Sequence, residues 1–512
     1  MRQIGFKNFR KFQDFPTIDL APITLFVGEN NAGKSTVVKA ILALLDFLNS
    51  GVANSGFNDR NTSILNQQFY FNKSYFTHIG TFQRALNNKA EEDKITFDIA
   101  FDHYKFVIEV MGDRGDEEAI SGRISRLLVT LLEYNIDFDF DFRQDNIHAT
   151  FHHSENPLWD VKRISQLKVQ QEQERKILKK YYDSFNTDIE FDMPISGMEG
   201  YSAGNNIGSL YSIALAKINA TIMANKGGDK QPLFAYAQQI AVEGLSEEVL
   251  QFLTKNNRLF DRLGTMNSFT LHTDFSDAAV EYIYAHAVTQ TVIYSAKDIN
   301  DYFVRTIHDF ANQRVLPDTP IHTFIVKWMK EFKIGADYEI NSVGGEAHIV
   351  KIKSNDGTEV NLADKGMGSI QLMILLFRLA TKMAQSGVGF GGQLQSSTII
   401  VEEPEQNLHP MLQSKLADLF YSINQDYGFR IIIETHSEYL IRRSQVIVGE
   451  KYDTPEKLVD NPFKVFYFPT DGVPYDMVYG TSGMFKEKFG EGFFNEAGKL
   501  HMQVLQNAKK GE

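Results

Sequence analysis

One glycine-rich segment near the N-terminus has the residue types and the spacing of a phosphate-binding loop. Residues 28–35 read GENNAGKS, which fits G-x-x-x-x-G-K-[ST], and they lie between an apolar run at 23–27 and a helical pattern that starts at Ser35. In such loops the backbone N–H groups hold phosphates, the lysine reaches the β- and γ-phosphates, and the hydroxyl ligates Mg²⁺. The predicted nucleotide site comprises Gly28, Glu29, Asn30, Asn31, Ala32, Gly33, Lys34, Ser35 and Thr36, with Lys34 catalytic and Ser35 on the metal.

Two carboxylates follow a second apolar run. Residues 398–401 read TIIV and lead into Glu402 and Glu403. Ligands of open parallel sheets bind at the carboxyl ends of the strands. Consecutive strand residues point to opposite sides, so we expect the two carboxylates to divide the work, one at the magnesium shell and the other on water. The alternative is that both merely end a strand.

A histidine follows a third apolar run. Residues 431–433 are isoleucines, and Glu434, Thr435 and His436 come directly after them. The end of this strand should adjoin the end that carries Glu402, so His436 is a candidate sensor of the γ-phosphate. A structural histidine is the alternative.

Two glycines precede the most apolar helical pattern in the sequence. Gly366, Gly368 and Ser369 lie where a helix begins, and backbone N–H groups at such a place can form an anion-binding nest. We interpret this nest as a site for a second phosphate group. A single chain already has one phosphate loop and would have little use for another for its own nucleotide. An ordinary loop is the alternative.

Composition bounds the remaining choices. The chain has 512 residues, a formal net charge of −13 and no cysteine, which excludes disulfides, thiolate zinc sites and cysteine nucleophiles. The acidic balance, with a pI near 5.5, restricts any DNA or RNA contact to a local surface. The apolar stretch 370–380 is too short to cross a bilayer, and no signal peptide is apparent, so we expect no membrane anchor and a cytoplasmic location.

The elements that must position these groups alternate between apolar strands and helices, which predicts a parallel sheet covered on both faces. We expect the N-terminal half of the core, with a β-rich lobe, at 1–155; a mostly helical insertion, with helices at 161–182 and 277–311, at 156–335; the C-terminal half at 336–445; and a C-terminal extension at 446–512. The fold class is α/β.

A strand-like run at 136–142 carries Asp137, Asp139 and Asp141. Carboxylates spaced by two residues could ligate a metal, as in a nuclease, but on a strand they more often form its solvated face. We favour the solvated face.

In chain order, the four segments resemble the Walker A, signature, Walker B and switch-histidine motifs of ABC-type ATPase heads related to SMC, RecF and the OLD family. The opening IGFKNFRKF, followed by ITLFVGENNAGKST, is similar to the start of those proteins, and EEPEQNLHP at 402–410 resembles their Walker B block. The resemblance covers about the first hundred residues and 340–445. It implies a P-loop NTPase with an ABC-like ATPase head that binds ATP and Mg²⁺.

The resemblance also implies roles for individual residues. Glu402 would hold Mg²⁺ through water, Glu403 would be the general base, and His436 would contact the γ-phosphate. Gly366, Gly368 and Ser369 would bind ATP held by a second subunit, so the chain is expected to form a homodimer or a higher homo-oligomer. Gln83 lies in the region where a magnesium-contacting glutamine is expected.

One departure from the common motifs points to a particular group among the resembled ATPases. The segment DKGMGS at 364–369 replaces the Ser-Gly-Gly form. With Gln371 it gives the pattern Gly-x-Gly-x-x-Gln, which resembles that of bacterial anti-phage defence ATPases of the Septu, PARIS and retron-associated types. The expected function is an ATPase that senses a signal or regulates a separate effector, a nuclease. The alternatives are a DNA-repair or chromosome-processing ATPase, and a nuclease with its own metal site. Residues 437–512 contain no Asp-x-Asp pair, so we do not expect the toprim nuclease of OLD proteins there.

Overall fold

The computed structural model describes residues 1–53, 68–72, 79–101, 104–131, 136–144, 146–151, 189–194, 279–284, 294–295, 302–344, 347–386, 397–490, 493–494 and 496–510. The chain divides into two compact units. The first consists of Met1–Asp19 and Lys39–Phe275, and the second of Leu20–Val38 and Ser276–Glu512. Helix α1 (Lys34–Ala53) begins in the second unit and ends in the first.

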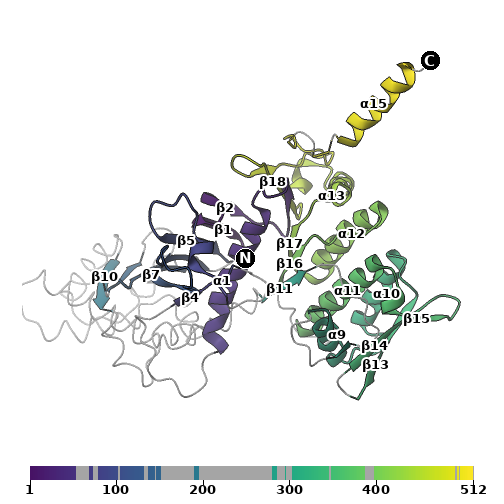
Figure 1. Ribbon diagram of the computed structural model, residues 1–512, viewed down its shortest axis with the longest axis horizontal. Helices are drawn as coiled ribbons and strands as arrows, with labels where there is room; N and C mark the ends of the chain where they lie inside the picture. Colours follow the sequence, from purple (N-terminus) through teal and green to yellow (C-terminus); the bar gives the residue numbers. More distant parts are fainter. Residues whose placement is uncertain are drawn as a thin grey trace, which may run out of the picture. The chain divides into compact units, whose positions relative to one another are not determined.

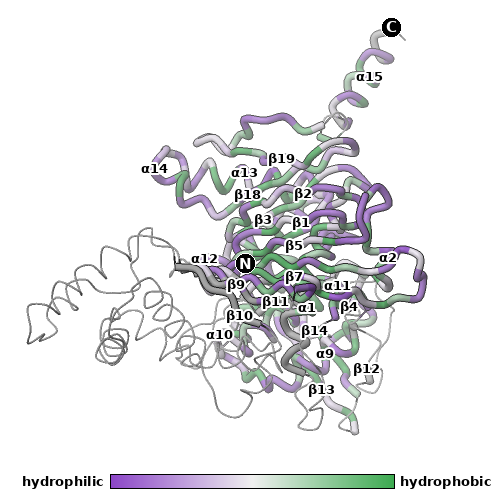
Figure 2. Tube along the Cα trace, turned by 90° about the vertical axis from the view of Figure 1, so that its left-hand side faces the viewer, coloured by the Kyte–Doolittle hydropathy of each residue, from purple (hydrophilic) through white to green (hydrophobic). Residues whose placement is uncertain are grey.

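An antiparallel sheet, with α2 and the end of α1, makes up the described part of the first unit (Figure 1). Its strands lie in the order β10-β9-β8-β7-β6-β5-β1-β2, and β4 pairs with β7. Buried residues alternate with more exposed ones along β5. Figure 2 colours the strands of this sheet by hydropathy. The elements are β1 (Gln3–Phe9), β2 (Phe12–Asp19), β4 (Gln68–Tyr70), α2 (Phe82–Ala85), β5 (Lys94–Ala100), β6 (Tyr104–Met111), β7 (Ser121–Leu131), β8 (Ile136–Asp141), β9 (Asn146–Phe151) and β10 (Ile189–Pro194).

A six-stranded sheet forms the centre of the second unit, with the order β11-β16-β17-β3-β18-β19. All neighbours are parallel except β18 and β19. The strands are β3 (Ile23–Gly28), β11 (Ala279–Tyr284), β16 (Ser397–Glu402), β17 (Arg430–Glu434), β18 (Phe463–Phe468) and β19 (Tyr475–Met477). Strand β17 therefore lies between β3, which leads into the glycine-rich loop, and β16, which leads into the carboxylates.

Helices and a smaller sheet complete the second unit. Helix α12 packs on β17 and β3 as well as on α13, and α11 packs against α9 and α10. The remaining elements are α9 (Tyr302–Asn312), α10 (Pro320–Glu331), β13 (Asp337–Val343), β14 (Ala347–Lys353), β15 (Glu359–Asn361), η4 (Leu362–Asp364), α11 (Met367–Gln385), α12 (Pro410–Tyr427), α13 (Glu438–Lys451), α14 (Pro455–Leu458), α15 (Glu496–Lys510) and the two-residue strand β12 (Tyr294–Ser295).

Local chemistry explains where α12 begins and ends. His409 caps its N-terminus by accepting a hydrogen bond from the Met411 N–H, and Pro410 occupies the first turn, where its missing N–H costs nothing. Gly428 ends the helix in the left-handed conformation with φ of 69°, which glycine adopts without steric penalty. The helix is thus placed directly after the carboxylates and directly before β17.

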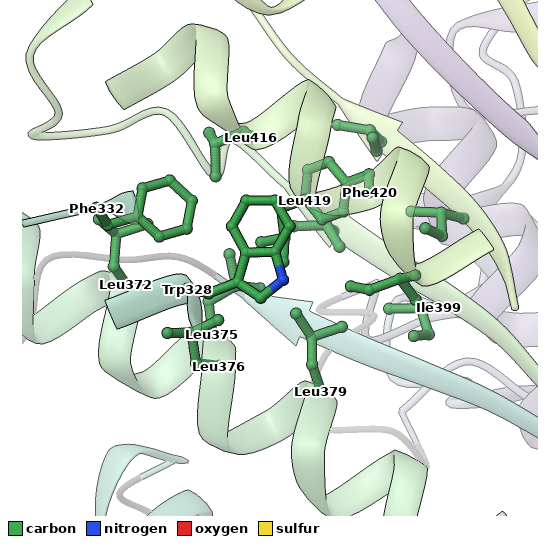
Figure 3. Packing of buried hydrophobic residues seen from close by; sticks show 14 of the residues in the cluster. Trp328, Phe332, Leu372, Leu375, Leu376, Leu379, Ile399, Leu416, Leu419 and Phe420 are labelled. Atoms are coloured by element: carbon green, nitrogen blue, oxygen red, sulfur yellow. The ribbon is translucent and has the colours of Figure 1, made fainter. Parts of the chain in front are cut away.

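The hydrophobic core of the second unit lies between its sheet and its helices. Trp328 of α10 is 3% exposed and packs among leucines of α11 and α12, with Ile399 of β16 nearby (Figure 3). Such close packing fixes the end of β16 relative to the helices. The position of β16, which leads into Glu402, is therefore fixed by the packed core.

The observed elements confirm most of the predicted strands and helices, and they correct one. The predicted helix at 277–311 is wrong over Ala279–Tyr284, which form strand β11 in parallel pairing with β16, and over Tyr294–Ser295, which form strand β12 beside β14. It is confirmed from Tyr302, where α9 begins. Within the predicted C-terminal extension, β18 joins the central sheet beside β3. The predicted helix at 161–182 lies outside the described residues, and the four-part domain division stays a prediction.

The three aspartates of β8 pair with polar neighbours of their own sheet. The Arg126 guanidinium binds Asp139, the Thr130 hydroxyl donates to Asp137 at 2.5 Å, and Arg143 binds Asp141. No cluster of three metal-ligating side chains occurs among the described residues. The paired, strand-borne arrangement favours a structural role for these aspartates.

Helix α11 is the one helix, among the residues the structure describes, that is long and apolar enough to cross a membrane. Its most apolar window is 72% buried inside the protein. Burial of this kind is typical of a core helix.

Candidate nucleotide-binding site

The glycine-rich loop joins β3 to α1 through a backbone that is left-handed at several positions. Gly28 has φ of 140°, Asn31 of 58° and Gly33 of 106°. A Cβ atom on Gly28 would lie 2.1 Å from the carbonyl oxygen of Phe468, because β18 pairs directly with β3 at this residue. Glycine is therefore required at position 28 both by the backbone conformation and by the neighbouring strand.

Lys34 is held inside this loop. Its side chain is almost fully buried, and Nζ donates hydrogen bonds to the carbonyl oxygens of Gly28 at 3.1 Å and Glu29 at 2.8 Å. Lys34 is also the first residue of α1, where the helix N-terminus favours negative charge. The ammonium and the helix end together make a place suited to phosphate oxygens.

The loop residues differ in exposure. Glu29, Asn30, Asn31 and Ser35 are exposed, whereas Ala32 and Thr36 are buried. The exposed residues are available to a ligand through their side chains. Ala32 and Thr36 could contribute only through the backbone unless the loop rearranges.

A carboxylate that the sequence analysis left without a role contacts this loop. The hydroxyl of Ser35 donates a hydrogen bond of 2.6 Å to Oε1 of Glu434, the last residue of β17, and Glu434 is 3% exposed. The sequence signal was present, because Glu434 is a polar residue at the end of an apolar strand. Its partner is 399 residues away, so the pairing could not be inferred from spacing.

The two predicted Walker B carboxylates separate through a turn. Glu402 ends β16, and the chain turns sharply at Glu403, whose φ is 46°. The Glu403 N–H donates to the carbonyl oxygen of Glu434 at 2.7 Å, and the Gln406 amide donates to the Glu403 carboxylate. A left-handed non-glycine residue is strained, and such residues concentrate at functional sites. Glu403 is thus fixed by its backbone and by its side chain.

The structure brings His436 next to Glu403. Nε2 of His436 lies 3.8 Å from Oε1 of Glu403, and the two side chains are 35% and 36% exposed. Burial lowers the pKa of His436 below its ordinary value, and the Lys34 ammonium lowers it further, against a smaller opposing effect of Glu403. The imidazole is therefore predominantly neutral at pH 7, and it can donate from one nitrogen or accept at the other.

Glu405 anchors the backbone of that histidine. Its Oε1 accepts a hydrogen bond of 2.6 Å from the His436 N–H, and its side chain is buried. Burial raises the pKa of Glu405, although the hydrogen bond from His436 acts in the opposite direction. The turn that carries Glu403 and the turn that carries His436 are joined by this contact.

The predicted second phosphate site lies at the start of α11. Gly366 caps the helix, and a Cβ atom there would meet nothing within 4 Å. A Cβ atom on Gly368 would lie 2.7 Å from the carbonyl oxygen of Asn407, in the turn that follows the carboxylates. Asn407 also donates to the Gln371 side chain at 3.2 Å. The helix start is thus packed on the carboxylate turn, while Gly366 is exposed and Ser369 is partly exposed.

Residues far along the chain support the glycine-rich loop. The hydroxyl of Thr470 donates to the carboxylate of Glu29, and the Glu29 N–H donates to the carbonyl oxygen of Phe468 at 3.3 Å. Sequence reasoning missed both contacts. The apolar run FKVFYF at 463–468 is the signal that could have identified an additional strand.

Gln83 is the one predicted site residue outside the second unit. It lies on the short helix α2 of the first unit. Its assignment to magnesium therefore stays a prediction.

The donor set fits ATP and Mg²⁺. Lys34 and the N-terminus of α1 supply positive charge for phosphates, and the loop that carries them is held against β18 at Gly28. Ser35 and Glu402 would supply hydroxyl and carboxylate oxygens, the ligands that Mg²⁺ prefers, and the Glu434 carboxylate lies beside them, on the Ser35 hydroxyl.

Comparison with known proteins gives one matching family and several solved structures of low sequence identity. The family described as AAA ATPase domain matches residues 1–441. No curated protein matches the sequence. Among solved structures, the chain is similar to the SMC head domain from Thermotoga maritima, with 9% identity and a TM-score of 0.32, over 94% of this chain and 100% of that one.

Two further solved structures are similar to the same extent. The Smc head domain derived from Pyrococcus furiosus, bound to the C-terminal domain of ScpA, has 10% identity and a TM-score of 0.31, and the match covers 98% of both chains. A structure of SmcHead bound to the C-winged helix domain of ScpA has 11% identity and a TM-score of 0.34, over 93% of this chain and 96% of that one. Similarities this distant carry no argument about mechanism.

Proposed function

Because the chain belongs to the AAA ATPase domain family, we propose that it binds Mg-ATP at the β3–α1 loop and hydrolyses it to ADP and phosphate. The observation that carries this proposal is the meeting of Glu403 and His436, 3.8 Å apart, at strand ends that neighbour the lysine-bearing loop. Lys34 would bind the β- and γ-phosphates. Bound Mg²⁺ would polarise the phosphate oxygens and neutralise developing charge.

Glu403 would accept a proton from the attacking water, because its carboxylate is held by Gln406 at the edge of the site. Neutral His436 would donate a hydrogen bond to the γ-phosphate. Glu402 would hold the metal through water. Phosphoryl transfer requires charge stabilisation, a proton acceptor and positioning of the phosphate, and a different group would serve each need.

Turnover by matched variants tests this proposal. Glu403→Gln should keep ATP binding and lower turnover by ~10²–10⁴-fold, the usual contribution of a general base. Glu456→Gln, on the exposed helix α14, is the matched control and should leave turnover unchanged. A fall of less than tenfold in Glu403→Gln would show that another residue is the general base.

We also propose that two chains associate head to head around ATP. One chain offers a phosphate loop at 28–36 and a glycine segment at 366–369 at a helix N-terminus. A two-fold arrangement would place each glycine segment over the partner's γ-phosphate, giving two equivalent composite sites. Loss of phosphate would then remove the charge that both surfaces share, and the interface would loosen.

Light scattering of Glu403→Gln with and without ATP tests the association. ATP should shift the protein from monomer to dimer, and adding Ser369→Arg should prevent the shift while ATP still binds. Ser482→Arg, at an exposed serine outside the segment, is the control and should not prevent it. Association that ignores both ATP and Ser369→Arg would contradict the composite site.

The resemblance of the 364–369 segment to defence ATPases supports a finer proposal. The chain would act in the bacterial cytoplasm as a sensor or regulator of a separate nuclease effector. Bacteria that carry the gene with its neighbouring genes should then resist phage, and Glu403→Gln should abolish resistance. Equal phage plating by wild-type and variant cells would contradict the defence role and leave the ATPase proposal standing.

A further inference from the structure

Glu434 occupies a central place between the two motifs that bind metal in the proposed site. It is the last residue of β17, which lies between β3 and β16. In the parallel register Glu434 is level with Glu402 on one side and with Phe26 on the other. Its carboxylate is therefore at the same edge of the sheet as the loop and the Walker B carboxylates.

Glu434 is joined to both motifs. Its Oε1 accepts the hydrogen bond of 2.6 Å from Ser35, and its carbonyl oxygen accepts the bond of 2.7 Å from the Glu403 N–H. A distance of 2.6 Å is typical of a hydroxyl bound to an ionised carboxylate, which is among the stronger hydrogen bonds in proteins. One buried residue thus connects the phosphate loop to the carboxylate turn.

The bond to Ser35 has a consequence for metal binding. A serine hydroxyl carries one hydrogen and two lone pairs. Because the hydrogen is directed to Glu434, the lone pairs face away from that carboxylate and are available to a cation. Mg²⁺ requires oxygen ligands in a near-ideal octahedral arrangement, so an oriented hydroxyl binds it better than a rotating one.

We propose that Glu434 is a positioning residue for Mg²⁺: its carboxylate holds the Ser35 hydroxyl with its lone pairs toward the metal, and its negative charge stabilises the cation. The resemblance to ABC-type heads assigns the metal-holding carboxylate to Glu402, whereas the carboxylate that accepts the hydrogen bond from the Ser35 hydroxyl is that of Glu434. The inference rests on the proposed nucleotide site and adds a residue to it.

Calorimetry of ATP binding with Mg²⁺ and with EDTA tests the inference. In the wild-type protein Mg²⁺ should strengthen ATP binding, and Glu434→Met, which has a similar volume and no oxygen, should reduce that strengthening about tenfold or more, the change expected when a hydrogen bond to a charged group is lost. Glu434→Gln retains an acceptor oxygen and should recover part of it. In EDTA both variants should bind ATP at least as tightly as the wild type, because the cation that the carboxylate stabilises is absent.

Thr398→Val provides the control for replacing a buried polar residue, because Thr398 lies at the opposite end of β16 and is buried. It should retain the full effect of Mg²⁺. Should Glu434→Met fail to fold, Glu434→Asp withdraws the carboxylate by one methylene and should reduce the Mg²⁺ effect in its place.

Two results would overturn the inference. One is an undiminished Mg²⁺ effect in Glu434→Met or Glu434→Asp, and the other is an equal loss of affinity with Mg²⁺ and with EDTA, which a purely structural role would give. Failure of the proposed function is distinguishable from both, because the wild-type protein would then bind ATP in neither condition.

Discussion

Replacing Gly368 with alanine should separate the packing role of the glycine segment from its proposed role in ligand binding. The added Cβ atom would lie 2.7 Å from the Asn407 carbonyl oxygen and 3.1 Å from Cδ2 of Leu408. Asn407 is itself left-handed, with φ of 57°, so its backbone has little freedom to withdraw. Gly366→Ala is the matched control, because nothing lies within 4 Å of its Cβ position and its φ of −61° suits alanine.

The expected magnitudes follow from these contacts. Overpacking of this kind costs ~1–3 kcal/mol, and the better helix propensity of alanine offsets up to ~1 kcal/mol of it. Gly366→Ala should be close to neutral, because alanine restricts the unfolded chain, a gain of ~0.4–1 kcal/mol, but is a poorer N-cap than glycine by a similar amount. The two variants should therefore differ by about 1–2 kcal/mol in the free energy of unfolding.

Denaturant unfolding without nucleotide measures this difference, with Trp328 fluorescence as the probe in a Trp159→Phe background. ATP-driven association should weaken in both variants, because both glycines belong to the proposed composite site. Equal stability of the two variants would refute the packing argument. Loss of association in Gly368→Ala alone would refute the role of Gly366 in binding the partner's nucleotide.

Three further outcomes are expected. Burial raises the pKa of Glu405 above its ordinary 4.5, so wild-type stability should fall as pH rises from 4.5 through the raised pKa. Glu405→Gln removes this loss, so the melting temperature of the variant should rise relative to that of the wild type as the pH increases above 4.5, and a constant difference would contradict the buried carboxylate. Lys34→Ala should raise the pKa of His436 and Glu403→Gln should lower it in NMR titrations, and an unchanged value in both would exclude their electrostatic contact. Trp328→Ala should cost ~3–5 kcal/mol in unfolding experiments, and a cost below 1 kcal/mol would show that α10 does not support the core.

The parallel core was predictable because its strands are short apolar runs that end in polar residues. The runs before Gly28, Glu402 and Glu434 form adjacent parallel strands, and this adjacency brings His436 to Glu403 as the sequence suggested. The fold class follows from the same pattern. These residues were predictable because each signal is local in sequence: an apolar run forms a strand, and the polar residue that follows it lies at the end of that strand.

The missed features depend on contacts between distant segments. The bond between Ser35 and Glu434 and the support of Glu29 by Thr470 join opposite ends of the chain. The strand at 279–284 was predicted as helix because a short, mostly apolar run such as AVEYIY suits either state, and its pairing with β16 decides between them. The sequence suggested that Glu402 and Glu403 are consecutive strand residues that point to opposite sides, whereas Glu403 lies in a left-handed turn after the strand has ended.

The most direct test of the central claim is calorimetry of ATP binding to the wild-type protein and to Lys34→Ala, with circular dichroism to confirm that both are folded. Lys34 is the ammonium held inside the loop, so its removal should abolish tight ATP binding while the secondary structure is retained. Equal affinity of the two folded proteins for ATP would contradict the assignment of the β3–α1 loop as the nucleotide site.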